Sequence, residues 1–198
     1  MPYAVAKTVA LVLGGVRSGK SRWAQEFALS AQARARATAE PANPRCAVAF
    51  IATAEALDEE MRCRIARHRA ERPAGWTTIE APIQVPGAIA GCGPNFGTLV
   101  IDCLTVWVSN LMQAEQCDRE RVLAHADRLC EELRRAPASV VLVSNEVGSG
   151  IVPADETTRL YRDLLGEVNQ RVARVADQVV LLVAGYPLVV KPAAGARP

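Results

Sequence analysis

One stretch near the N-terminus combines residue types that bind phosphate: Gly14, Gly15, Val16, Arg17, Ser18, Gly19, Lys20 and Ser21. Its glycines let the backbone curl so that successive N–H groups point at phosphate oxygens, and a following helix adds positive partial charge. Lys20 would bridge the outer phosphates of a nucleotide, and Ser21 would bind Mg²⁺. The alternative is a tight turn with an incidental Lys-Ser pair. We favour phosphate binding because only three of the 23 Lys and Arg residues are Lys.

His68 is a candidate nucleophile, because it lies among four arginines in the sequence: Arg64, Arg67, Arg69 and Arg72. Guanidinium groups bind polyphosphates, and positive surroundings favour the neutral, nucleophilic imidazole. The alternative is a core or half-buried histidine, since His68 continues an apolar stripe through Leu57, Met61 and Ile65 on an expected helix over 57–69. Composition and spacing leave these two interpretations equally supported.

Two carboxylates end apolar segments that are expected to be strands. Asp102 ends the segment 98–102, and in phosphate-loop proteins such an acid beside the loop's strand contacts Mg²⁺ directly or through water. Its alternative role is to cap the following helix. Glu80 ends the segment 76–80 and could contact a ligand or cap a helix that starts at Ala81 with Pro82 in its first turn.

A polar, glycine-containing loop over 145–153 follows the most uniformly apolar segment of the chain, 139–144. Loops at the carboxyl ends of strands line the ligand crevice of open α/β sheets, so Asn145 and Glu146 are candidates for substrate contact. The alternative is a flexible connector that ends in a helix cap at Asp155 or Thr157.

These residues fall on alternating strands and helices. Apolar runs predict strands over 8–13, 46–51, 76–80, 98–102, 139–144 and 179–183, and helical spacing predicts helices over 20–36, 57–69, 103–111, 118–135 and 157–176. Alternation of this kind predicts one α/β domain over 1–198, a RecA-like P-loop NTPase with a mostly parallel sheet and helices on both faces. Residues 188–191 would add an antiparallel edge strand. Residues 37–45 are expected to form an exposed connection, and 192–198 a frayed tail.

Composition limits the classes of partner. The net charge is only +2 and half the residues are hydrophobic, so we expect no nucleic-acid partner. No apolar run reaches the roughly 18 residues of a membrane span, so we expect no stable membrane association. Six cysteines without a C-x-x-C pair indicate small buried hydrophobes in a reducing cytoplasm. The other histidine, His125, is expected on the surface of a charged helix.

The ordered set of motifs resembles the bifunctional adenosylcobinamide kinase/adenosylcobinamide-phosphate guanylyltransferases of cobalamin biosynthesis. The resemblance runs from about Val9 to Lys191 and rests on residues 14–21, 50–54, 58–61, 64–69, 72–73, 76–80, 102–107, 144–153, 169–170 and 177. Departures are small: Val16 stands where the family often has Ala, and Phe50 where it often has Tyr. Residues 37–45 have no clear counterpart.

The resemblance implies two reactions. A nucleoside triphosphate, ATP or GTP with Mg²⁺, phosphorylates the aminopropanol hydroxyl of adenosylcobinamide. GTP then donates GMP to that phosphate through a GMP-histidine intermediate on His68, which releases pyrophosphate. We call residues 14–21 the phosphate loop. Besides this loop, the positions that match family nucleotide contacts are Ala52, Thr53, Ala54, Arg69, Arg72, Glu80 and Asp102.

The resemblance further implies a homo-oligomer, with a trimer expected, and a His68 helix that swings toward the phosphate loop. Two other classes compete with it. The first is a P-loop kinase for another small metabolite, in which His68 is structural. The second is a RecA-like motor or nucleic-acid-binding ATPase, which the near-neutral charge and the absence of an aromatic and basic patch disfavour.

Overall fold

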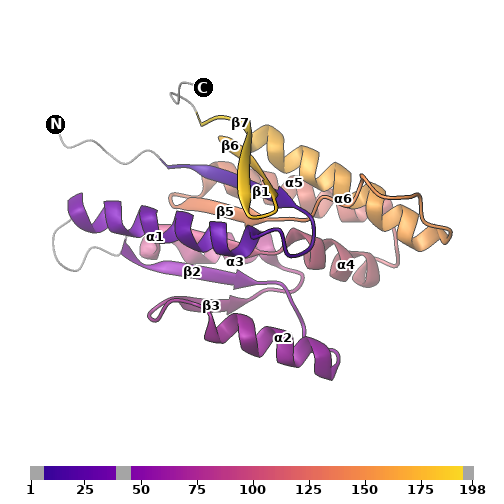
Figure 1. The fold of residues 1–198 in the computed structure, drawn as a ribbon, viewed down its shortest axis with the longest axis horizontal. Helices are drawn as coiled ribbons and strands as arrows, with labels where there is room; N and C mark the ends of the chain where they lie inside the picture. The colour runs from indigo at the N-terminus through magenta and orange to yellow at the C-terminus, as the bar shows by residue number, and fades with distance from the viewer. Residues whose placement is uncertain (1–6, 39–45, 194–198) are drawn as a thin grey trace.

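The computed structural model describes residues 7–38 and 46–193. The strands described form one seven-stranded sheet in the order β3-β2-β4-β5-β1-β6-β7 (Figure 1). Only the β6–β7 pair is antiparallel. The bounds are β1 Val9–Gly14, β2 Val48–Ala52, β3 Thr77–Glu80, β4 Thr98–Asp102, β5 Ser139–Val143, β6 Gln178–Val183 and β7 Tyr186–Lys191. The predicted mostly parallel sheet and its antiparallel C-terminal edge are therefore confirmed.

Helices cover both faces of the sheet, as predicted, but unequally. Helix α1 covers one face, while α3 to α6 pack on the other, and α2 lies at the β3 edge (Figure 1). Their bounds are α1 Lys20–Thr38, α2 Glu59–Ala70, α3 Val85–Cys92, α4 Leu104–Ala114, α5 Arg119–Arg135 and α6 Glu156–Val175, with a short 3₁₀ turn at Gly93–Asn95. Most of the expected connection 37–45 and tail 192–198 lies outside the described residues, so a single domain over 1–198 stays a prediction.

Alternation along the strands divides the core into two layers. In β1, Val9 and Leu11 pack with the helices α3 to α6, whereas Ala10 and Val12 face α1. The larger layer is centred on Trp107, which is fully buried. The layer under α1 is thin because small residues of that helix, Ala24 and Ala28, meet the sheet. Helix α1 therefore runs close to the strands that end at the phosphate loop.

Helix α2 does not contribute to this core. It has no buried residue, and Leu57, at the start of the expected apolar stripe, is 70% exposed. His68 is half-buried, like Met61 and Ile65 of the same stripe, so it is not fully buried in the core, and the interpretation of a half-buried histidine that ends an apolar face stays open. The helix is not buried more deeply because it carries two glutamates and four arginines that would be costly to desolvate.

The two lysines outside the phosphate loop hold helix ends. The Lys7 ammonium donates to two carbonyls in the last turn of α5, both at 2.8 Å. The Lys191 ammonium donates to Ala173 O and Ala176 O at the end of α6, at 3.2 and 2.5 Å. Cations at helix C-termini satisfy carbonyls that lack an intrahelical partner and favour the helix dipole. These contacts tie both ends of the described chain to the α5 and α6 layer.

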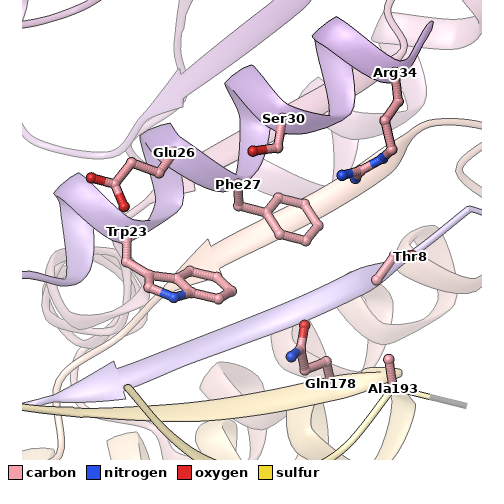
Figure 2. A pocket seen from close by; sticks show the side chains of 8 residues that line it. All are labelled: Thr8, Trp23, Glu26, Phe27, Ser30, Arg34, Gln178 and Ala193. Carbon is pink, nitrogen blue, oxygen red and sulfur yellow. The ribbon is translucent and has the colours of Figure 1, made fainter. Parts of the chain in front are cut away.

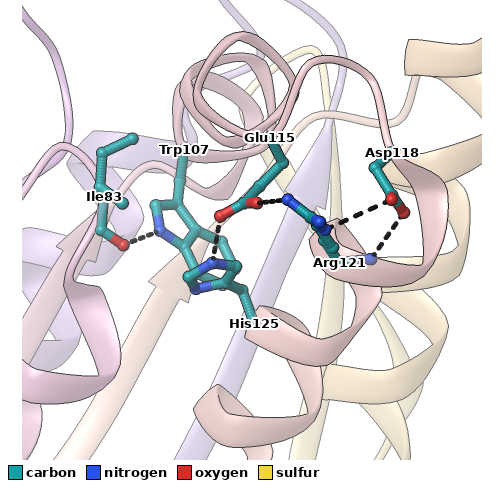
Figure 3. A network of polar contacts seen from close by, with 6 residues as sticks. All are labelled: Ile83, Trp107, Glu115, Asp118, Arg121 and His125. Carbon is teal, nitrogen blue, oxygen red and sulfur yellow. Dashed lines mark hydrogen bonds and ion pairs between the residues drawn. The ribbon is translucent and has the colours of Figure 1, made fainter.

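His125 is not the surface residue that its charged helix suggested. Its side chain is 12% exposed and lies 3.0 Å from the Glu115 carboxylate, which also pairs with Arg121 (Figure 3). Nearby, the Trp107 indole N–H donates to Ile83 O at 2.8 Å (Figure 3). The spacing of charged residues along α5 could not predict this contact, because its partner Glu115 lies outside α5, at the C-cap of α4.

Three smaller expectations need correction or are met in part. Helix α3 starts at Val85 with Pro86 in its first turn, so Pro82 precedes the helix. All six cysteines are free thiols, but only Cys92 and Cys130 are buried, while Cys63 and Cys117 are exposed. Within residues 7–38 and 46–193, no helix has the length and apolar character needed to cross a bilayer.

The larger core layer predicts a stability difference between two leucines. Leu142 in the middle of β5 is fully buried, whereas Leu29 on α1 is 42% exposed. Replacing Leu142 with Ala should lower the free energy of unfolding by about 2–5 kcal/mol, because it removes buried contacts and leaves a cavity. Leu29→Ala should cost less than about 1 kcal/mol. Urea denaturation followed by circular dichroism measures both, and equal losses would contradict this assignment of the core.

Candidate active site

The predicted site residues end neighbouring strands at one edge of the sheet. Because β1 to β6 run parallel, their carboxyl ends meet at the same edge (Figure 1). The register places Glu80 beside Ala52, Ala52 beside Asp102, and Asp102 beside Val143. On the other side of β5, Val143 pairs with Val12, two residues before Gly14. The sheet therefore brings together residues that are far apart in the sequence.

The phosphate loop needs glycine at its first position. Gly14 has φ +154°, and a Cβ there would lie 2.5 Å from Ser18 Oγ and 2.6 Å from Leu182 O. Gly19 has φ +99°, a conformation that L side chains rarely adopt. The Ser18 hydroxyl is buried and has no hydrogen-bond partner among the described residues. The loop is thus closely packed against β6 and carries a polar group that a bound phosphate could satisfy.

Lys20 opens α1 and is buried, as a phosphate-binding lysine should be. Its ammonium donates to Gly15 O at 2.5 Å. Burial lowers the pKa of Lys20, and the nearby Cys103 thiol and Asp102 carboxylate partly oppose that effect. The cation therefore lies in a poorly solvated place, where its attraction for phosphate is strong.

Asp102 is hydrogen-bonded to Ser21 and does not cap a helix. Its carboxylate accepts from the Ser21 side chain, while the N-cap position of α4 belongs to Cys103. We expected Asp102 on the strand next to β1, but β5 lies between them. The contact forms nevertheless because α1, which begins at Lys20 and Ser21, packs across β4 and β5. Burial raises the pKa of Asp102, and the hydrogen bond and the nearby cations act in the opposite direction.

His68 lies within electrostatic reach of Asp102. The two residues are distant in the sequence, because β3 and α3 lie between α2 and β4. The His68 side chain is half-buried, as are Met61 and Ile65 on the same helix. Arg72 lies in the same group: its guanidinium stacks 3.7 Å above the Phe50 ring, donates to Thr78 Oγ1 at 2.9 Å and interacts with Asp102. Burial lowers the pKa of Arg72. His68 and Arg72 therefore both act electrostatically on the carboxylate that interacts with Ser21 of the phosphate loop.

The remaining charged candidates divide into paired and unpaired groups. Arg69 forms an ion pair with Glu80, which explains Glu80 better than a helix cap, since Gln84 holds the cap position of α3. Arg64 and Arg67 are exposed and have no ion pair in the described part of the chain. Two guanidinium groups on the His68 helix are thus free to meet an anionic ligand.

Thr53 and Asn110 form hydrogen bonds to the backbone next to the carboxyl ends of β2 and β4. Thr53 is fully buried, and its hydroxyl both donates to Cys103 O and accepts from Cys103 N, each at 2.8 Å. Asn110 donates to Thr53 O and Pro82 O at 2.8 and 3.0 Å. Sequence reasoning missed Asn110, although an amide within the apolar helix 104–114 was a usable signal. The neighbours of Thr53, Ala52 and Ala54, are half-buried beside it.

Cys103 is enclosed by these contacts. Burial, together with the Asp102 charge, raises the pKa of its thiol to about 11. The thiol therefore stays protonated at neutral pH.

The donors present suit magnesium. Ser21 and Asp102 supply hard oxygen ligands, and Mg²⁺ at nucleotide sites usually keeps only one or two protein ligands, with phosphates and water completing the shell. The described residues contain no cluster of three or more His, Cys, Asp or Glu able to hold a metal by themselves. A site that needs the nucleotide to complete it agrees with both observations.

The loop after β5 is tied to the phosphate loop. The Glu146 N–H donates to Gly14 O at 3.1 Å, and the Asn145 N–H donates to Thr105 Oγ1 at 2.8 Å. Asn169 on α6 donates to Asn145 O at 3.0 Å. Asp155 caps α6, as the flexible-connector alternative predicted. Asn145 and Glu146 are nevertheless fixed by hydrogen bonds at the carboxyl ends of the strands.

Two surface hollows lie elsewhere. One of about 430 Å³ runs between α1 and the starts of β1 and β6, with the stacked Trp23 and Phe27 rings on its helical side (Figure 2). Another of about 660 Å³ lies between α5 and α6. Neither is lined by Lys20, His68 or Asp102.

Comparison with known proteins decides the family. Residues 10–190 match the family described as cobinamide kinase / cobinamide phosphate guanyltransferase. The chain belongs to this family. The match confirms the resemblance drawn from the sequence motifs and the class of enzyme that it implied.

Curated relatives of the family agree along the whole chain. The bifunctional adenosylcobalamin biosynthesis protein CobP of Pseudomonas aeruginosa is 40% identical over 181 residues, covering 91% of this chain and 96% of its own. The bifunctional adenosylcobalamin biosynthesis protein CobU of Salmonella typhimurium is 40% identical over 192 residues, covering 91% and 98%.

A solved structure supports the fold alone. The KaiC-like protein of Pyrococcus horikoshii superposes with a TM-score of 0.51 at 16% identity, over 93% of this chain and 79% of that one. The α/β architecture expected of a P-loop NTPase is thereby confirmed.

The raised pKa of Asp102 predicts that its ionised form lowers the stability of the ligand-free protein. Because burial raises its folded-state pKa above the unfolded value, ionised Asp102 destabilises the ligand-free fold, and the effect develops as pH rises above about 4. Asp102→Asn should therefore raise the melting temperature at pH 8, with a smaller difference near pH 4. The same variant should lose nucleotide-dependent activity. Differential scanning fluorimetry across this pH range tests the first point, and a lower melting temperature at pH 8 would contradict it.

Proposed function

We propose that this protein phosphorylates adenosylcobinamide with ATP or GTP and then transfers GMP from GTP to the product through a GMP-histidine intermediate on His68. The supporting observation is that His68 lies within electrostatic reach of Asp102, whose carboxylate accepts a hydrogen bond from Ser21 of the phosphate loop. One nucleotide site would thus serve two reactions that differ in which phosphorus is attacked.

In the first reaction, the phosphate loop binds the triphosphate through its backbone N–H groups, and Lys20 neutralises the outer phosphates. Magnesium would be held by Ser21 and Asp102, where it supplies charge neutralisation for the phosphates. The acceptor hydroxyl oxygen forms a bond to the γ-phosphorus, and the nucleoside diphosphate leaves.

In the second reaction, a neutral imidazole nitrogen of His68 attacks the α-phosphorus of GTP, and pyrophosphate leaves. The acceptor's phosphate then attacks the same phosphorus and displaces the imidazole, giving adenosylcobinamide-GDP. Arg64, Arg67 and Arg72 surround this position on α2 and the following turn, where they would stabilise charge on the phosphates. Arg69 is paired with Glu80, so this ion pair would have to open before either side chain contacts the nucleotide.

The nucleotide contacts proposed are the phosphate loop, residues 52–54, Arg69, Arg72, Glu80 and Asp102. Within this set, the Thr53 hydroxyl is already hydrogen-bonded to the backbone of Cys103, so Thr53 would fix the shape of the site. His68 already lies near Asp102, so any swing of α2 needed for attack is a local adjustment of an exposed helix.

Labelling with GTP tests the intermediate. Protein incubated with [α-³²P]GTP and Mg²⁺ should acquire an acid-labile, alkali-stable adduct, and His68→Ala should reduce it by at least about a hundredfold because the nucleophile is gone. Lys20→Ala should lose the adduct as well, since the triphosphate is no longer held.

His125 offers the matched control for this experiment. His125→Gln keeps a polar partner for Glu115 and should label like the unchanged protein. Equal labelling of the His68 variant would reject His68 as the nucleophile, and an unlabelled wild-type protein would leave only the kinase activity.

We also propose that the protein forms a homo-oligomer in the cytoplasm. The edge strand β7 carries exposed apolar side chains, namely Tyr186, Leu188, Val189 and Val190, and only one of its edges is paired in the described residues. Unpaired, apolar edge strands are aggregation-prone unless covered, so a second copy of the chain is a fitting occupant. Six free thiols agree with a reducing compartment.

Size-exclusion chromatography with light scattering tests the oligomer. The unchanged protein should elute as a multiple of the monomer, with a trimer expected, and the double variant Leu188→Glu/Val190→Glu should elute as a monomer. Leu29→Glu, which changes an exposed leucine on α1, should leave the mass unchanged. A monomeric wild-type protein would reject the oligomer, and an unchanged mass in the double variant would reject β7 as the interface.

A further inference from the structure

A kinase step needs a group that accepts the proton of the acceptor hydroxyl, and the residues assigned so far leave that role open. His68 serves the α-phosphorus, and Asp102 accepts from Ser21. Glu80 is paired with Arg69. Among the described residues, Glu146 is a further acid whose backbone is bonded directly to the phosphate loop.

The position of Glu146 is set by its backbone. Its N–H donates to Gly14 O at 3.1 Å, while the Lys20 ammonium donates to the next carbonyl, Gly15 O, at 2.5 Å. The segment therefore emerges next to the cation that would hold the outer phosphates. The preceding residues are also held, because Ser144 N–H donates to Val12 O at 2.9 Å and Asn145 is bonded on both its N–H and its carbonyl.

The Glu146 carboxylate is oriented but not neutralised. Its Oε1 accepts from the Gly148 N–H at 2.7 Å, and no ion-pair partner is present in the described residues. A Cβ on residue 148 would lie 2.8 Å from that oxygen, so glycine makes room for the carboxylate. The side chain is exposed, so an acceptor can reach it from solvent.

The same loop offers apolar surface for a large acceptor. Ile151 is 97% exposed and Val152 64% exposed. Arg162 donates to Ile151 O at 3.1 Å and Arg159 to Pro153 O at 3.1 Å, so α6 supports this exposed tip. Exposed apolar side chains held beside a free carboxylate suit an acceptor with an apolar body and a reacting hydroxyl.

We propose that Glu146 is the general base of the kinase step, a role that rests on the proposed function. The acceptor oxygen forms its bond to the γ-phosphorus while its proton passes to the Glu146 carboxylate. The bond from the γ-phosphorus to the bridging oxygen of the β-phosphate breaks, and the nucleoside diphosphate leaves with that electron pair. Guanylyl transfer needs no such base, because the attacking groups are an imidazole and an acceptor phosphate that is already ionised.

The two half-reactions separate this role from a structural one. Glu146→Gln keeps the shape and should lower kcat for phosphorylation of adenosylcobinamide by about 10²–10⁴-fold, with little change in the nucleotide KM. Labelling by [α-³²P]GTP and GMP transfer to preformed adenosylcobinamide phosphate should stay within about twofold. Glu146→Asp should recover part of the kinase rate, which a merely structural role of this side chain would not predict.

Glu131→Gln is the matched control, because Glu131 is exposed on α5, away from the site edge. It should leave both reactions unchanged. A kinase rate in Glu146→Gln within threefold of wild type would overturn the role of Glu146 and leave the proposed function intact. Loss of both reactions would also overturn it, in favour of a structural role. A wild-type protein without either activity would reject the proposed function itself.

Discussion

The site depends on keeping a carboxylate charged in a place where water does not solvate it well. Asp102 ends a buried strand, and burial alone would favour its protonated form. The Ser21 hydroxyl and the nearby side chains of His68, Arg72 and Lys20 oppose that tendency. Lys20 and Ser21 begin α1, whereas His68 lies on α2 and Arg72 just after it, so the carboxylate interacts with two segments that are distant in the chain. A bound nucleotide with its metal would satisfy the same charges from the open side.

Polar contacts beneath the edge make this arrangement rigid. Thr53 fixes the backbone of Cys103, and Asn110 fixes Thr53 in turn. On the other side of the loop, Asn169 holds Asn145, and Glu146 holds Gly14. Buried polar groups are costly to leave without hydrogen bonds, so the bonds that Thr53, Asn110 and Asn169 make favour one geometry for the edge. Mobile parts of the mechanism must then come from α2, which has no buried residue.

Much of the fold was predictable because its signals are local. Continuous apolar runs marked the buried parallel strands, and their alternation with helical spacing predicted the mostly parallel sheet. The phosphate loop was predictable for the same reason, since its glycines, lysine and serine are adjacent in the chain. The resemblance to the family rests on short motifs in order, and the family match confirms it. Local patterns failed for Leu57, because an apolar stripe does not say whether anything packs against it.

The sequence by itself determined the strand-loop-helix that binds phosphate, the class of fold and the family. Only the tertiary structure decided that His68 lies within electrostatic reach of Asp102, that β5 separates β4 from β1, and that His125 is paired with Glu115. These facts depend on contacts between residues distant in the chain, and residue spacing carries no information about strand order or about which helix meets which edge. The same limit applies to Glu146: its residue type was visible in the sequence, but its place beside Gly14 and Lys20 follows from the pairing of β5 with β1.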